Sequence, residues 1–284
     1  MPISSIQNLG FLGPRGTFSD QAAQAYRDTA ALHPYLTFGE ILAALLSLEI
    51  DGALLPIENS TDGPVNEVLD GLIRHEELVI VSETILTIEQ NLIGVQSADI
   101  SSIEAVVSIP IVLAQVRRWL EANLPATERR ATTSTARAVE MLDDAHPEVA
   151  AIGTRIAAEI YGRKVLAEAI QDNPDNVTRF VMVRRYPCPV TEPTGRDRTT
   201  LIVAVPDKPG SLVRALNVFD ALTVNINKIE SRPRGVSGRP ALFREAIFHI
   251  DIDGHREEPV ISVALQALAD KCEYLRVAGS YPRQ

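Results

Sequence analysis

The sequence predicts an α/β protein of two domains, and three observations lead to this prediction. Short apolar runs alternate with helical stretches over the first ~180 residues, the pattern of a sheet flanked by helices. Residues 186–199, YPCPVTEPTGRDRT, hold three prolines and a glycine and predict a linker, although a long surface loop within one domain is the alternative. Beyond this segment, strand and helix patterns follow in the order βαββαβ, a split βαβ arrangement. A length of 284 residues suits one large or two moderate domains.

Before the linker, five apolar runs and six stretches of helical periodicity can be assigned. The predicted strands are Asn8–Leu12, Gly52–Pro56, Ala105–Ser108, Ala150–Ile152 and Arg179–Val183. The predicted helices are Ser19–Asp28, Phe38–Leu48, Val65–His75, Ile111–Ala122, Ser134–Asp143 and Thr154–Tyr161. In folds of this class, ligands bind at the carboxyl ends of strands, against loops that open helices. Those loops are therefore where we expect a site.

After the linker, the apolar periodicity changes regularly between that of strands and that of helices. Strands are predicted at Thr200–Val205, around Val224 and Ile226, at 246–252 and at Tyr274–Ala278, with helices at 212–222 and 261–268. In the third strand, Ala246, Phe248, Ile250 and Ile252 alternate with His249, Asp251 and Asp253, which indicates one buried and one solvated face. A small sheet with helices on one face needs cover on the other, so we expect this domain to dimerise.

Composition and charge narrow the classes of function. Apolar residues make up 45% of the chain and charged residues 23%, as in globular proteins, and the formal net charge is −10. So acidic a chain is a poor candidate for binding nucleic acid or an anionic membrane. Two cysteines cannot build a disulfide framework, and no basic leader or membrane-length apolar stretch is visible. We therefore expect a soluble protein of the reducing cytoplasm.

Four loops that open predicted helices are rich in hydroxyl and amide side chains. Short donors and backbone N–H groups in such places stabilise a carboxylate or a phosphate. The same residue types are also the commonest helix caps, so a shared anion pocket and plain capping both remain open. The four loops are residues 13–19, 56–63, 132–136 and 153–155.

Residues 172–180, DNPDNVTRF, form a more specific candidate. Thr178 and Arg179 are neighbours where a predicted strand opens, so their side chains face opposite ways unless the backbone bends. A turn followed by a strand with an exposed arginine is the alternative. No hydrolase, P-loop, zinc-protease or dinucleotide motif occurs, and we interpret each of the five scattered histidines as a surface side chain. The residues thus predict a pocket for a small anion, without metal or cofactor, and no particular reaction.

Six segments together resemble prephenate dehydratase, over nearly the whole chain and in that family's order. The ENS loop, the Thr-Arg-Phe triplet and the ESRP segment are specific to the family. The segments are GPRGTFS (13–19), PIENSTDGPVNEVLDGL (56–72), STA (134–136), YGRKVLAEAIQDNPDNVTRF (161–180), GSLVRAL (210–216) and NKIESRP (227–233). No chorismate mutase helix precedes residue 10, so the chain resembles the monofunctional form.

The resemblance implies a bilobed α/β catalytic domain similar to type II periplasmic binding proteins, at residues 1–185. A βαββαβ ferredoxin-like ACT regulatory domain would follow at 199–280. The chain would cross between the lobes near residues 80 and 176, at Val79–Glu83 and Asp175–Thr178. The implied reaction is the decarboxylative dehydration of prephenate to phenylpyruvate in phenylalanine biosynthesis. Phenylalanine would be the feedback inhibitor, and the implied assembly is a homodimer through the ACT domains, with pairing into a tetramer left open.

The resemblance also assigns roles to residues. Prephenate loses carbon dioxide and hydroxide as its ring becomes aromatic, so the site must hold two anions and ease out the hydroxyl. Thr178 would donate a hydrogen bond to that hydroxyl, Arg179 would stabilise the lobe junction or a carboxylate, and Phe180 would pack beneath. Glu58 is unfavourable beside a dianion unless protonated or paired, so we expect it to orient other groups. The other catalytic and substrate-binding candidates are Asn59, Ser60, Thr17, Thr61, Ser134, Thr135 and Asn176. The phenylalanine-binding candidates are Gly210, Ser211, Leu212, Val213, Glu230, Ser231, Arg232 and Pro233.

Four positions depart from the family's usual pattern. Ile109 and Ile111 stand where His and Gln are usual, Gln90 where His is usual, and Ser211 where Ala is usual. Relatives that only decarboxylate prephenate typically lack the threonine that is present here as Thr178, which favours the dehydratase. The alternatives are a non-aromatising prephenate decarboxylase, an arogenate dehydratase and a non-catalytic phenylalanine-sensing protein.

Overall fold

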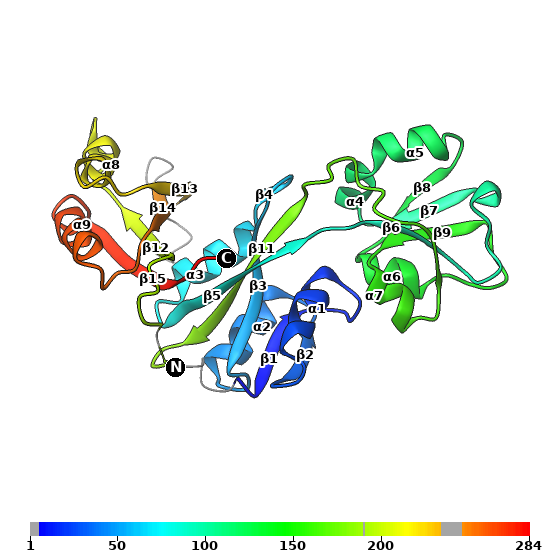
Figure 1. The fold of residues 1–284 in the computed structure, drawn as a ribbon, viewed down its shortest axis with the longest axis horizontal. Helices are drawn as coiled ribbons and strands as arrows, with labels where there is room; N and C mark the ends of the chain where they lie inside the picture. The colour runs from blue at the N-terminus through cyan, green and yellow to red at the C-terminus, as the bar shows by residue number, and fades with distance from the viewer. Residues whose placement is uncertain (1–5, 190, 234–245) are drawn as a thin grey trace.

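The computed structural model describes residues 6–189, 191–233 and 246–284, which form three units in a row (Figure 1). A first lobe lies in the middle, a second lobe at one end and the C-terminal domain at the other (Figure 1). Among the described residues, no helix is both long and apolar enough to cross a membrane.

The first lobe is built on a mixed sheet in which parallel strands meet two long antiparallel ones. β1 pairs in parallel with β2 and β3, and β11 lies antiparallel between β3 and β5. Thr17 and Thr37 cap the helices that follow β1 and β2, each accepting a backbone N–H in the first turn. The elements are β1 (Asn8–Leu12), α1 (Phe18–Ala23), a 3₁₀ turn (Gln24–Tyr26), β2 (Ala31–Tyr35), α2 (Phe38–Leu46), β3 (Gly52–Asn59), β4 (Gly63–Pro64), α3 (Asn66–Arg74), β5 (Leu78–Thr87) and β11 (Val177–Arg185).

The second lobe has its own five-stranded sheet among the described residues, in the order β10-β6-β9-β7-β8. The helix predicted at Ile111–Ala122 is interrupted, because Val116 leaves the helical region with φ −115° and ψ 14°. The elements are β6 (Asn91–Gly94), a 3₁₀ turn (Ile100–Ser102), β7 (Ala105–Ser108), α4 (Pro110–Gln115), α5 (Arg117–Asn123), β8 (Glu128–Ala131), α6 (Thr135–Glu140), β9 (Val149–Gly153), α7 (Arg155–Ile160) and β10 (Lys164–Ala167).

Two strands carry the chain out of the first lobe and back. β5 stays in the first sheet as far as Thr87, where it pairs with Val177, so the chain leaves several residues after the expected crossing at Val79–Glu83. The return leads into β11, which begins at Val177. The Ile88 amide donates to the Asn176 carbonyl at 2.8 Å and ties the two crossing segments together. Any relative movement of the lobes must therefore act on the start of β11.

The C-terminal domain has the predicted βαββαβ order. Its strands are wholly antiparallel in the order β13-β14-β12-β15, the ferredoxin-like arrangement, and α8 and α9 cover one face with an apolar core. The fold class predicted from the sequence is confirmed. The elements are β12 (Asp197–Ala204), α8 (Ser211–Ala221), β13 (Ile226–Pro233), β14 (Ala246–Asp253), α9 (Pro259–Ala269) and β15 (Tyr274–Pro282).

The second face of this small sheet is covered by α3 of the same chain. Ile202, Ile247 and Tyr281 belong to one buried apolar cluster with Leu69 and Leu72 of α3. The expectation of dimerisation drawn from an uncovered face was therefore wrong in its reasoning. The interpretation of every histidine as a surface side chain was also wrong, because His249 and His255 are each only 2% exposed.

The sheets of the first lobe and the C-terminal domain are continuous. Gly279 of β15 pairs in parallel with Ile80 of β5, and this contact joins ten described strands into one sheet. A Cβ atom at position 279 would lie 2.3 Å from the Ile80 carbonyl oxygen, so only glycine permits this approach. β13, in the C-terminal domain, is the outermost strand at one edge of that sheet, and β2, in the first lobe, is the outermost strand at the other edge.

Candidate active site

A buried threonine and an asparagine face each other where the two lobes meet. Thr178 on β11 is in register with Asn59 on β3, and the Asn59 amide donates to the Thr178 hydroxyl oxygen at 2.9 Å. Because an amide N–H can only donate, Thr178 accepts this bond and keeps its own proton for another acceptor. Thr178 is 8% exposed, so a ligand reaching it would be largely removed from water.

The loop after β3 folds tightly around this pair. The Asn59 amide also donates to Asn176 Oδ1 at 2.8 Å, and Asn59 Oδ1 accepts the backbone amide of Thr61 at 2.8 Å. Ser60 accepts the Val177 amide at 3.0 Å. The structure therefore brings Asn59, Ser60, Thr61 and Asn176 to the start of β11, beside Thr178.

Arg179 is buried and paired. Its guanidinium lies 2.6 Å from Glu58, 3.3 Å from Glu83 and 2.6 Å from Asp251, and its side chain is 4% exposed. The alternative of a strand with an exposed arginine is thus contradicted. The register of β11 against β3 shifts only after Arg179, between Arg179 and Phe180, so the expected alternation of Thr178 and Arg179 is kept. Phe180 is 1% exposed within the apolar core behind the sheet.

Glu58 is paired with cations, one of the two conditions under which a carboxylate was expected to be tolerated near a doubly charged substrate. One carboxylate oxygen lies 2.6 Å from Arg179 Nε, and the other lies 2.6 Å from Lys228 Nζ of β13. Two cationic partners, one on each oxygen, fix the orientation of this carboxylate. This pairing supports an orienting role and connects the site to the C-terminal domain.

A second group of predicted residues lies on the two edges of the lobe junction. The Thr154 hydroxyl of the second lobe donates to the Gly16 carbonyl of the first at 2.6 Å. Gly16 has φ +86°, and a Cβ there would lie 3.0 Å from Ala157 Cβ and 3.5 Å from Ala136 Cβ. Their neighbours Thr17 and Thr135 therefore lie along the same junction.

The hydroxyl groups of Thr17 and Ser134 cap helices, as one of the two interpretations of these loops predicted. Thr17 accepts the Asp20 amide at 3.2 Å, and Ser134 accepts the Arg137 amide at 3.0 Å. A capping hydroxyl accepts a hydrogen bond and keeps its proton, which Ser134 could donate to a carboxylate. The Thr17 hydroxyl already donates to the Leu12 carbonyl at 3.1 Å. The geometry thus leaves substrate binding by Thr17, Ser134 and Thr135 as a proposal.

Sequence reasoning assigned no role to three residues of the second lobe that reach this region, Gln115, Arg117 and Arg118. Gln115 Nε2 donates to Asp62 Oδ2 across the junction at 2.5 Å, and Gln90 donates to Gln115 Oε1 at 3.1 Å. Burial raises the pKa of Asp62 despite the Gln115 hydrogen bond that opposes it. Beside them is a cavity of about 280 Å³, lined by Thr61, Ala114, Gln115, Arg117, Arg118, Gln171, Asp172, Asn173 and Asn176. The break at Val116, which no periodicity signalled, separates Gln115 from the helix that carries Arg117 and Arg118.

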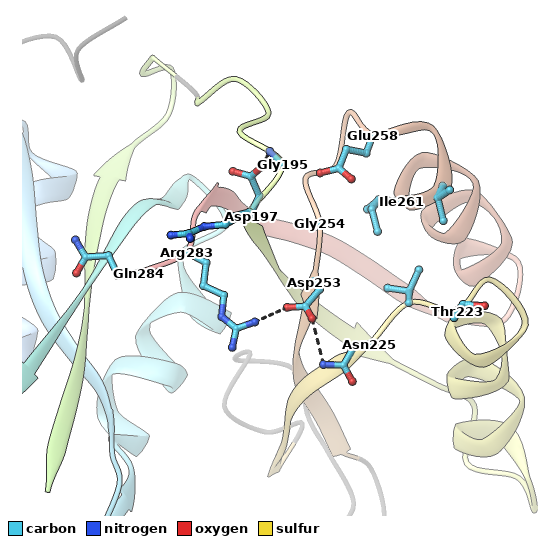
Figure 2. Close-up of a pocket in the computed structure, with 13 residues that line it drawn as sticks. Gly195, Asp197, Thr223, Asn225, Asp253, Gly254, Glu258, Ile261, Arg283 and Gln284 are labelled. Atoms are coloured by element: carbon cyan, nitrogen blue, oxygen red, sulfur yellow. Dashed lines mark hydrogen bonds and ion pairs between the residues drawn. The ribbon is translucent and has the colours of Figure 1, made fainter. Parts of the chain in front are cut away.

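Another cavity, of about 740 Å³, is bordered by the linker, by the C-terminal residues Arg283 and Gln284, and by the C-terminal domain (Figure 2). It is bordered by Asp253, which accepts hydrogen bonds from Arg283 and Asn225 (Figure 2). None of the residues predicted for the site lines it. Within the described ranges, no group of three or more His, Cys, Asp or Glu side chains is arranged to hold a metal ion.

The fold and the site define a two-lobed α/β protein whose lobe junction gathers hydroxyl and amide groups, with a ferredoxin-like domain docked on one lobe. The chain belongs to the prephenate dehydratase family, because the family's profile matches residues 9–187. The profile of the ACT domain matches residues 199–267. The family predicted from the sequence is confirmed.

Individual relatives agree with this assignment. The prephenate dehydratase of Amycolatopsis methanolica is 36% identical over 279 residues, covering 98% of this chain and 89% of that protein. The crystal structure of prephenate dehydratase from Arthrobacter aurescens in complex with L-Phe matches with a TM-score of 0.88 at 36% identity, covering 97% of this chain and 90% of that one. The structure of GqqA, described as a novel type of quorum quenching acylase, matches with a TM-score of 0.86 at 28% identity over 98% of both chains.

Proposed function

We propose that this protein is a prephenate dehydratase, which converts prephenate into phenylpyruvate, carbon dioxide and water and is inhibited by phenylalanine. One observation carries the proposal. In a chain of this family, the buried Thr178 hydroxyl is held by Asn59 at 2.9 Å beside the lobe junction. The same hydroxyl favours this reaction over decarboxylation alone, since a group must assist the departing ring oxygen.

The chemistry needs orientation and hydrogen bonding. The bond from the ring to its carboxylate breaks, its electron pair makes the ring aromatic, and the ring hydroxyl leaves and takes up one proton as water. Thr178 would donate a hydrogen bond to the leaving oxygen, while Asn59 fixes its direction. A threonine hydroxyl is a weak acid, so this role is a hydrogen bond or relay during bond cleavage.

Two carboxylates must be held at the same time. Thr17, Ser134 and Thr135 on the junction edges, with Ser60, Thr61 and Asn176 beside Thr178, would supply neutral donors. Arg117 and Arg118, on the cavity next to Asn176, would supply positive charge within a chain of net charge −10. Closure of the lobes would remove water from the leaving carboxylate, which favours its loss as neutral carbon dioxide.

The C-terminal domain would bind the inhibitor. Gly210, with φ +78°, opens α8 at the first predicted motif, 210–213, and β13 carries the second, 230–233. Because β13 is an edge strand, a second copy could extend the sheet there. We infer a cytoplasmic homodimer formed through the ACT domains, with a tetramer as a further assembly.

Product identification tests the function. The pure protein is incubated with prephenate, with and without phenylalanine, and the products are separated and identified. Phenylpyruvate whose formation phenylalanine suppresses would support the proposal. A dihydro product would indicate a decarboxylase, preference for arogenate an arogenate dehydratase, and phenylalanine binding without turnover a sensor. Hydrolysis of an N-acyl substrate alone would place the chain with GqqA instead.

A further inference from the structure

Four charged side chains from two domains meet beneath the catalytic strand pair. Glu58 and Arg179 are opposite each other in the register of β3 and β11, and Lys228 and Asp251 are opposite each other in the register of β13 and β14. Three ion pairs of 2.6 Å join Lys228 to Glu58, Glu58 to Arg179, and Arg179 to Asp251. We call these four residues the charge ring.

The charge ring is balanced, and three of its four members are largely removed from solvent. The side chains of Arg179 and Asp251 are 4% and 3% exposed, that of Lys228 is 14% exposed and that of Glu58 is 32% exposed. The ring holds two charges of each sign. The second Asp251 oxygen accepts the Thr200 hydroxyl at 2.7 Å. Burial opposes ionisation of Asp251, yet Arg179 and Thr200 outweigh it and hold the pKa of this carboxyl below its usual value. Buried charges this close tolerate little displacement, because a charge that loses its partner there is costly.

One side of the charge ring reaches the reacting groups. Glu58 directly precedes Asn59 on β3, and Arg179 directly follows Thr178 on β11. Asn59 and Thr178 are the next register pair, joined by the 2.9 Å hydrogen bond. A shift of Glu58 or Arg179 therefore moves the backbone that aims the Thr178 hydroxyl.

The other side reaches the predicted inhibitor motif. Lys228 lies two residues before Glu230 on β13, so both side chains point to the same face of that strand. Lys228, Glu230 and Arg232 alternate with exposed residues along β13 and turn toward the first lobe, where Arg232 pairs with Asp70 of α3 at 2.7 Å. Movement of β13 is thus transmitted to Glu58 through one side chain.

We propose that Lys228 and Asp251 are positioning residues of the active site, and that phenylalanine inhibits by drawing Lys228 away from Glu58. The inference rests on the proposed function and adds the path between the two sites. Inhibitor and substrate binding then affect each other by the same factor, as linkage requires. Lys228 and Asp251 touch no substrate and act through Glu58 and Arg179.

The test uses the full-length protein and four variants. Lys228→Met removes the charge and keeps the length of the side chain, and Lys228→Arg restores a cation. Asp251→Asn keeps an acceptor for Thr200 but removes the charge. Asp253→Asn is the matched control, since Asp253 lies two residues further on β14 and pairs at 2.9 Å with the exposed Arg283 instead (Figure 2). Each protein is measured for kcat, KM, phenylalanine binding by calorimetry, and inhibition.

If the charge ring couples the sites, Lys228→Met will bind phenylalanine as the wild type does. Because it lacks the contact with Glu58 permanently, it will have the low kcat of the inhibited wild type, and phenylalanine will not lower that kcat further. In the wild type, the coupling is expected to be about 5- to 150-fold, the usual range for allosteric proteins. Asp251→Asn should lower kcat more than it raises KM. Lys228→Arg should recover inhibition, which a merely structural role for Lys228 would not explain. Should Asp251→Asn fail to fold, the two Lys228 variants still test the inference.

Two results would overturn the inference in a wild-type enzyme that phenylalanine inhibits. One is inhibition of Lys228→Met equal to that of Asp253→Asn, and the other is loss of phenylalanine binding together with inhibition. If the wild type does not turn over prephenate, the proposed function fails separately. Hydrogen exchange of β3 and β11 then decides the inference, because faster exchange of both strands in Lys228→Met supports the charge ring and unchanged exchange rejects it.

Discussion

The first lobe has two boundaries, and they are built from opposite kinds of contact. Toward the second lobe, the contacts described above are single hydrogen bonds. Those of Gln115 with Asp62 and of Asn173 with Thr61 lie at exposed positions, and that of Thr154 with Gly16 is buried. Toward the C-terminal domain, the sheet is continuous, the apolar core is shared, and Arg179 and Asp251 form a buried ion pair. The boundary between the two lobes is therefore suited to opening and closing around a ligand. The boundary with the C-terminal domain is suited to transmitting a displacement while the two parts stay in contact.

Thr178 lies where the two boundaries meet, and its substitution should separate catalysis from stability most clearly. We expect Thr178→Ala to lower kcat by ~10²–10⁴, the usual worth of a proton-transfer or hydrogen-bonding group, with the fold intact. That loss equals about 3–5 kcal/mol of activation free energy. Thr178→Ser is the matched control and should retain most of the activity. Steady-state kinetics and circular dichroism check the outcome, and wild-type turnover by Thr178→Ala would refute the assigned role.

The difference between the two boundaries should appear as a difference in the free energy of unfolding that is lost when a contact in each is removed. Asp251→Ala leaves Arg179 buried with one partner fewer and should lower the free energy of unfolding by about 3–5 kcal/mol. Thr61→Ala removes an exposed junction contact, the hydrogen bond from Asn173, and should cost about 1 kcal/mol at most. Urea denaturation of both variants provides the comparison. Equal losses would mean that the two boundaries do not differ as described.

A buried histidine makes the docked boundary sensitive to acid. His249 donates to the Leu69 carbonyl at 3.1 Å, and burial lowers its pKa from 6.5 to about 4. Between pH 6.5 and about 4, His249 is therefore protonated in the unfolded chain but neutral in the folded chain. The free energy of unfolding consequently decreases as the pH falls from 7 to 4. The loss attributable to His249 should be about 3 kcal/mol.

Replacing this histidine should flatten the pH profile. His249→Gln retains a donor for Leu69 but does not titrate, whereas His146→Gln changes an exposed histidine and serves as control. Urea midpoints between pH 7 and pH 4.5 are the measurement. Asp251, whose pKa is lowered, adds an acid sensitivity of the same sign below pH 4 in every variant. An unchanged profile in His249→Gln would contradict the buried neutral state.

Two glycines give the smallest expected effects, one at each boundary. Gly279→Ala places a Cβ against the Ile80 carbonyl and should destabilise the docked C-terminal domain by about 1–3 kcal/mol, as overpacking usually does. Gly16→Ala strains a residue at φ +86° by about 1–2 kcal/mol and places a Cβ 3.0 Å from Ala157 Cβ of the second lobe. We expect Gly16→Ala to raise KM, because residue 16 lies at the lobe junction. We expect Gly279→Ala to increase proteolysis between the first lobe and the C-terminal domain. If Gly279→Ala raised KM and Gly16→Ala increased proteolysis between the domains, the roles assigned to the two boundaries would be contradicted.

Much of the fold follows from local periodicity. β1 and β7 have their predicted bounds, and the C-terminal domain has the predicted element order. β8 was not predicted, because Glu128–Ala131 is exposed throughout and carries no apolar alternation. The division of α4 from α5 at Val116 depends on tertiary packing, which no single position in that stretch reveals.

The site was predictable only where its residues lie in recognisable segments. Asn59, Ser60 and Thr178 come together as the resemblance implied. Lys228 and Asp251 were not predicted, because polar residues that alternate with apolar ones in a strand normally face water. Their partners Glu58 and Arg179 are distant in sequence, so only the docked domains bring the opposite charges together.

The shared charge ring has a practical consequence for relieving feedback control. Cutting the chain after residue 185 would expose the apolar side of α3 and leave Glu58, Glu83 and Arg179 without Asp251, Arg198 and Lys228. Such a fragment would lose solubility and precise alignment along with its response to the end product. A deregulated enzyme is therefore better obtained by exchanging single residues of the predicted inhibitor motif, 230–233, while keeping Lys228, than by removing the regulatory portion.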